Sequence, residues 1–140
     1  MKWALSLLLF PSVAFADGIC ADLNDLVDQA VSDRPVTFDL AGAPTPPDCS
    51  RSLELGGVRA VTCGWSYPYR DAAAMAAFDD LLGGVARCGD VLGRDDSQVS
   101  HPDSYDLRMF SVQDAEVSVS LKDKGALAET WLFLRAASGS

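Results

Sequence analysis

Residues 127–135 read LAETWLFLR, and this stretch is apolar at both odd and even positions. Successive side chains of a strand point to opposite faces of the sheet, so such a strand has apolar side chains on both faces. Strands of this kind are usually central in a sheet or covered by a helix. We therefore predict a final strand in the core, with Leu132 and Leu134 beneath the second of two helices.

The residues before this strand alternate in the same way. Apolar side chains recur at every second position in residues 105–109 and again in residues 115–121. Turns are predicted near Gln113–Asp114 and at residues 122–125. Because the connections are short, the three strands are expected to form an antiparallel meander.

Earlier in the chain, residues 52–61 read SLELGGVRAV and predict a hairpin. The turn is placed at Gly56–Gly57, with Leu53 and Leu55 facing inward. Alternating apolar residues in the segment 36–40 predict one more short strand, whereas the polar segment 89–103 is expected to be a loop.

Two amphipathic helices complete the pattern. Apolar residues recur at helical spacing in residues 19–31, and a second helix is predicted over residues 71–87. The buried face of the second helix is predicted to hold Met75, Phe78, Leu82 and Val85, widened by Ala74 and Leu81. The sequence predicts an α+β fold. The hairpin and the C-terminal three-strand meander form an antiparallel sheet of about five to six strands, and both helices pack on one face of it.

The N-terminal residues have the features of a secretory signal. Lys2 precedes an apolar run over residues 3–10, and Ala14-Phe15-Ala16 offers small residues for cleavage. The run is shorter than the ~20 residues of a membrane helix. We predict a cleaved signal peptide at residues 1–16, a single domain at residues 17–140, periplasmic or secreted localisation and no stable membrane anchor.

Four cysteines follow the predicted cleavage site, and an even number in an exported chain predicts two disulfides. Three connectivities are open. Cys49 and Cys63 lie almost symmetrically about the Gly56–Gly57 turn, which favours a bridge across the hairpin. Cys20 would then pair with Cys88 and link the first helix to the end of the second.

The charge of the chain limits its partners. The formal net charge is −9 at pH 7. This charge disfavours nucleic acid, because binding to phosphates requires a basic surface. It keeps the surface solvated, and it is compatible with a cationic protein or an envelope component as partner. The oligomeric state is left open.

The residue types that enzymes use are sparse. A cysteine hydrolase needs a thiolate activated by histidine, and the chain has one histidine, His101, with Asp103 close by. Using one cysteine as a nucleophile would leave another without a disulfide partner. The cysteines lack the clustered spacing of a zinc site, and the loop aspartates do not match a calcium-binding loop. No metal or other cofactor is predicted.

Two aromatic segments are the candidate binding surface. The predicted binding residues are Trp65, Tyr67, Tyr69, Arg70, His101, Asp103 and Tyr105. Tryptophan, tyrosine and arginine dominate the binding energy of protein interfaces. In the alternative interpretation, Trp65 and Tyr67 cap the core and His101 is an ordinary loop residue.

The leading functional hypothesis is a small, non-enzymatic exported protein that binds another protein or an envelope ligand. The alternatives are a periplasmic hydrolase that uses His101 with an unidentified partner residue, and a purely structural role in the envelope.

Overall fold

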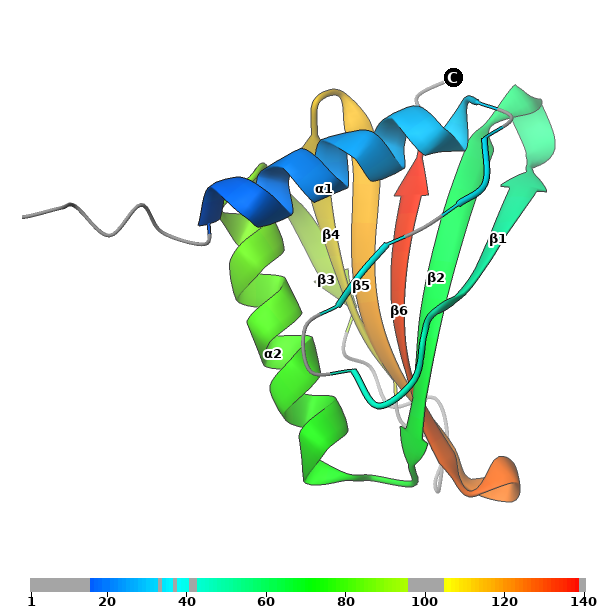
Figure 1. Ribbon diagram of the computed structural model, residues 1–140, viewed down its shortest axis with the longest axis vertical. Coiled ribbons are helices and arrows are strands. Elements are labelled where there is room, and N and C mark those ends of the chain that lie inside the picture. The colour runs from blue at the N-terminus through cyan, green and yellow to red at the C-terminus, as the bar shows by residue number, and fades with distance from the viewer. Residues whose placement is uncertain (1–15, 33, 37, 41–42, 96–104, 139–140) are drawn as a thin grey trace, which may run out of the picture.

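The computed structural model describes residues 16–32, 34–36, 38–40, 43–95 and 105–138. Within these residues a single antiparallel sheet has the strand order β1-β2-β6-β5-β4-β3, and two helices lie on one of its faces (Figure 1). The predicted α+β class, hairpin and C-terminal meander are confirmed. The elements are α1 (Ala16–Ala30), β1 (Asp48–Leu53), β2 (Arg59–Pro68), α2 (Ala72–Ala86), β3 (Asp90–Asp95), β4 (Tyr105–Val112), β5 (Ala115–Lys124) and β6 (Glu129–Ala137).

The central position of β6 follows from its two apolar faces. β6 pairs with β2 on one side and with β5 on the other. Leu134 lies opposite both Cys63 and Val119 in the register, and all three residues have no exposed surface. Leu132 is also fully buried on this helix-covered face, as predicted.

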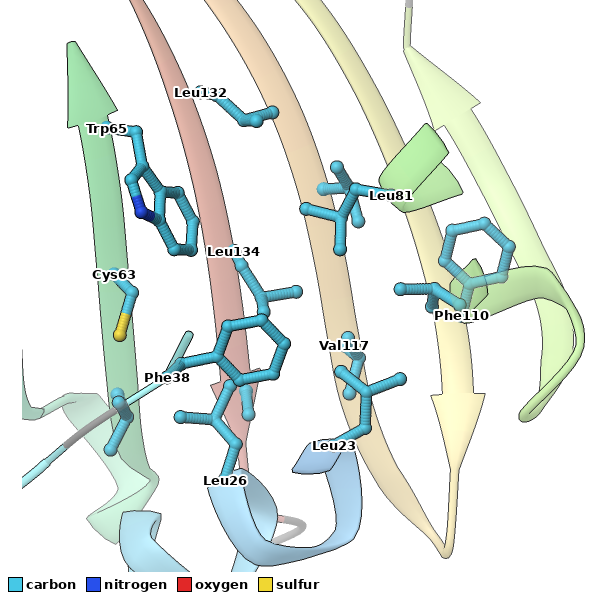
Figure 2. Packing of buried hydrophobic residues seen from close by; sticks show 14 of the residues in the cluster. Leu23, Leu26, Phe38, Cys63, Trp65, Leu81, Phe110, Val117, Leu132 and Leu134 are labelled. Atoms are coloured by element: carbon cyan, nitrogen blue, oxygen red, sulfur yellow. The ribbon is translucent and has the colours of Figure 1, made fainter. Parts of the chain in front are cut away.

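The core fills the space between this face of the sheet and the helices. Leu23 and Leu26 of α1 approach the sheet side chains from one end, whereas Leu81 of α2 approaches from the side (Figure 2). The buried residues of α2 are Ala74, Phe78, Leu81, Gly84 and Val85. The prediction for Met75 is wrong: it is 59% exposed, because it lies about 100° around the helix from Ala74.

The segment predicted as an early strand is irregular instead. Residues 36 and 38–40 are described and belong to no strand, while residue 37 lies outside the described residues. Phe38 is 4% exposed and packs edge-on against Trp65, with 6.1 Å between ring centroids. The alternation therefore reflects a segment that covers the core without joining the sheet.

The prediction that the hairpin leucines face inward is also wrong. Leu53 is 75% exposed and Leu55 is 98% exposed. β1 is an edge strand, and Cys49 is its only residue that is not exposed. The predicted turn is present, since Gly56 and Gly57 both have positive φ angles, which glycine adopts without steric cost.

The sixth strand, β3, lies in a segment that we expected to be a loop. It pairs with β4, and the register shifts between Val91 and Gly93, so that Leu92 forms a bulge. A bulge breaks the strict alternation of side chains, which is why the apolar pattern did not reveal this strand.

Both predicted disulfides are present. Cys49 pairs with Cys63 in the β1–β2 register, and Cys20 of α1 is bonded to Cys88, just after α2. Two disulfides indicate an oxidising, extracytoplasmic environment. No helix in the described part of the chain is long and apolar enough to cross a membrane. The predicted signal peptide falls almost entirely on residues 1–15, outside the described residues.

Candidate binding surface

The aromatic residues predicted to bind a partner separate into different environments. Trp65 has no exposed surface and Tyr67 is 5% exposed, and both point into the helix-covered core. Neither ring therefore offers contact area to a partner. Tyr69 is half-buried and Arg70 is exposed at the end of β2.

The second predicted segment is described only in part. His101 and Asp103 lie outside the described residues. Tyr105 begins β4, and its backbone pairs with Lys122 of β5. Lys122 pairs with Trp131 of β6, and Trp131 pairs with Ser66 of β2. The start of β4 and the end of β2 therefore lie at the same end of the sheet, separated by β5 and β6.

Arg70 belongs to a polar cluster at this end. The Arg70 backbone N–H donates to Thr130 Oγ1 at 2.8 Å, and Thr130 Oγ1 donates to Asp123 Oδ1 at 2.6 Å. The Arg70 Nε donates to Asp123 Oδ2 at 3.2 Å. Asp123 is 7% exposed, so these bonds compensate the cost of burying its charge. The cluster holds Arg70 in the left-handed region, with φ of 55°.

Two buried polar atoms of β2 lack hydrogen-bond partners. Among the described residues, neither Trp65 Nε1 nor Tyr67 Oη has a hydrogen-bond partner. Burial raises the pKa of the Tyr67 hydroxyl above its ordinary value of 10.0, and the charge of Asp71 raises it further. Tyr67 therefore remains neutral at a pH at which an unfolded tyrosine ionises.

Replacing this hydroxyl tests its burial. Tyr67→Phe is expected to raise the free energy of unfolding at pH 7 by about 1 kcal/mol, because an unsatisfied buried group is removed. In the native protein the folded state retains the proton longer than the unfolded state, so stability falls as the pH rises above 10. Urea unfolding at pH 7 and pH 11 measures both effects. If the stability of Tyr67→Phe falls equally steeply above pH 10, the Tyr67 hydroxyl is not the cause of that fall.

The face of the sheet away from the helices carries an aromatic pair. Trp131 and Phe133 of β6 stack with 5.6 Å between centroids and 9° between planes, and we call this pair the aromatic stack. Lys124 Nζ lies 5.8 Å from both ring centroids, and Trp131 Nε1 donates to Glu129 Oε2 at 2.8 Å. These contacts hold both rings in place on a face that neither α1 nor α2 covers (Figure 1).

Gly64 of β2 makes room for the stack. A Cβ atom at residue 64 would lie 2.9 Å from Phe133 Cε1 and 3.2 Å from Trp131 Cε3. Both rings therefore lean across the neighbouring strand and remain half-buried. Leu107 and Met109 of β4 are half-buried on the same face, two strands away.

Sequence reasoning did not select Trp131 or Phe133 as binding residues. The available signal was the apolar character of both faces of β6, combined with the placement of both helices on one face. Together these require Trp131 and Phe133 to lie on the uncovered face.

A pocket of about 450 Å³ lies farther along this face, and we call it the acidic pocket. Arg135 lines the pocket, and its Nη2 donates hydrogen bonds to Glu54, at 2.6 Å to Oε1 and 2.5 Å to Oε2. Its Nη1 lies 3.7 Å from Glu116 Oε1. Asp114, in the turn between β4 and β5, supplies a third carboxylate to the lining.

The described residues offer few groups for catalysis. All four cysteines are in disulfides, so the chain provides no thiol nucleophile. No cluster of metal-ligating side chains occurs among the described residues. The hydrolase alternative depends on His101 and stays a prediction.

Fold and surface together define a small α+β domain with two disulfides and, among the described residues, one sheet face without a helix (Figure 1). Comparisons of the chain with protein-family models, with curated proteins and with solved structures find no match.

Proposed function

We propose that this chain is an exported, non-enzymatic protein, periplasmic or secreted, that binds another protein through its helix-free sheet face. The observation that carries the proposal is the aromatic stack. Antiparallel sheets that face water usually present polar side chains there, whereas this one presents Trp131 and Phe133 at its centre.

The residue types around the stack support a protein as the ligand. Trp131 and Arg135 belong to residue types that contribute strongly to the binding energy of protein interfaces. Leu107 and Met109 add apolar side chains to the same face, separated from the stack by the serines of β5, while Lys124 places charge beside the stack. An apolar centre with charged neighbours is the usual arrangement of a protein interface.

The proposal is tested by site-specific photocrosslinking in the native cell envelope. A photoreactive amino acid replaces Lys122, which is exposed and pairs with Trp131 without belonging to the stack. We expect one discrete protein adduct, identified by mass spectrometry. Phe133→Ala should weaken binding by about 2 kcal/mol, as for a residue at the centre of an interface, and remove the adduct.

The matched control places the same photoreactive group at Met75, which is 59% exposed on α2. We expect no adduct there, because α2 lies on the other side of the sheet. An adduct that forms equally from both positions, or one that survives both Trp131→Ala and Phe133→Ala in folded protein, would contradict the proposal. A small envelope ligand would leave no protein adduct.

A further inference from the structure

The end of the helix-free face that contains Arg135 combines the acidic pocket with exposed leucine side chains. Leu92, in the bulge of β3, lines the pocket and is 57% exposed. Leu55 follows the pocket residue Glu54 at the hairpin tip and is 98% exposed. We call Leu55 and Leu92 the leucine rim. Both leucines expose apolar surface that a partner seated on the pocket would bury.

The charges of the pocket indicate what it accepts. Three carboxylates, from Glu54, Asp114 and Glu116, line it together with the single guanidinium of Arg135. Glu54 is engaged closely by Arg135, whereas Glu116 is 3.7 Å from it and its side chain is 50% exposed. Among the described residues, no hydrogen bond or ion pair engages the Asp114 carboxylate. The negative charge therefore exceeds the positive charge on the side of Asp114 and Glu116.

We infer that the leucine rim and the acidic pocket form a docking site for a cationic segment of a partner protein. An arginine or lysine of that segment enters between Asp114 and Glu116, and its apolar neighbours pack on Leu55 and Leu92. This inference rests on the proposed function, since Arg135 follows Phe133 on the same face of β6. It names the chemistry of the partner, which the aromatic stack alone does not.

A defined peptide pair tests the inference. The first peptide alternates arginine with leucine, and the second replaces each arginine with citrulline, which keeps the shape and removes the charge. Titrations are followed through the backbone amide NMR signals of the isotope-labelled protein. The arginine peptide should shift the signals of residues 54–55, 92 and 114–116 and bind about tenfold more tightly than the citrulline peptide.

Paired variants separate local charge from net charge. Asp114→Asn with Glu116→Gln should weaken arginine-peptide binding about tenfold. Asparagine tolerates the left-handed φ of 62° at residue 114, so the turn is retained. The control, Asp79→Asn with Asp80→Asn, removes the same charge from exposed positions on α2 and should bind like the native protein.

Equal binding of both peptides, equal losses in both double variants, or shifts confined to other residues would each overturn the inference. The photocrosslink from residue 122 distinguishes this inference from the proposed function. An adduct unaffected by Asp114→Asn with Glu116→Gln would leave the proposed function intact and remove the docking site. Charge-dependent peptide binding without any adduct would retain the docking site and contradict the proposed function.

Discussion

Removal of the Cys20–Cys88 disulfide by double alanine substitution is expected to lower the free energy of unfolding by about 4 kcal/mol. The two cysteines are 68 positions apart, so the bridge closes a long loop and strongly restricts the unfolded chain. A loss of this size is a large part of the roughly 5–15 kcal/mol that stabilises an ordinary domain. Urea unfolding of the purified protein measures it.

The second bridge provides the comparison. Cys49 and Cys63 are 14 positions apart, for which the same relation gives about 3 kcal/mol. Their strands remain paired by the sheet in the folded state, whereas α1 and α2 meet through side chains, with Ile19 packed on Gly84. If loss of the Cys49–Cys63 bridge proves more costly than loss of Cys20–Cys88, restriction of the unfolded chain is not the main source of the stabilisation.

Gly89→Ala is expected to destabilise the fold by about 3 kcal/mol, at the upper end for an overpacked site. A Cβ atom at this position would lie 2.1 Å from the backbone oxygen of Ser111 and 2.8 Å from Val112 Cγ2. A backbone oxygen cannot rotate away as a side chain can. The pairing of Asp90 with Ser111 must therefore shift, and with it the start of β3.

Thermal unfolding followed by circular dichroism tests this expectation, with a fall in Tm of roughly 10 °C. Gly83→Ala is the matched control, because a Cβ atom there meets no heavy atom within 4 Å. Alanine within a helix should raise stability by roughly 0.5–1 kcal/mol. A Gly89→Ala protein as stable as the native one would show that β3 is not held against β4 as described.

Local patterns predicted the elements whose residues repeat regularly. The spacing of Phe78 and Val85 located α2, and the two apolar faces of β6 placed Leu134 in the core. The symmetry of Cys49 and Cys63 about the glycine turn gave the hairpin bridge. Each of these signals is contained in one short segment, and each agrees with the tertiary structure.

The failures concern features that depend on distant residues. Phe38 alternates like a strand residue, but it lies in an irregular segment that packs over the core against Trp65. Leu55 is apolar, yet it lies at a tip beyond the core. β3 depends on pairing with β4 and contains a bulge, so neither its composition nor its period distinguishes it from a loop.

The binding surface was predicted only in part for the same reason. The sequence identifies aromatic side chains, but the face they occupy depends on the strand register, and a shift by one residue reverses it. Trp65 lies on the helix-covered face of β2, and Phe133 lies on the opposite face of β6. Only the packed helices determine which of these faces is open.

The position of β6 also determines at which stage of synthesis the sheet can be completed. β6 follows the other described strands in the chain, yet within the sheet it is the strand that links the β1–β2 hairpin to β5. A ribosome-bound chain that ends before residue 129 lacks the strand that pairs with both β2 and β5. The sheet is therefore completed only after β6 has been synthesised, so the pairing of the two halves cannot guide the folding of the earlier strands.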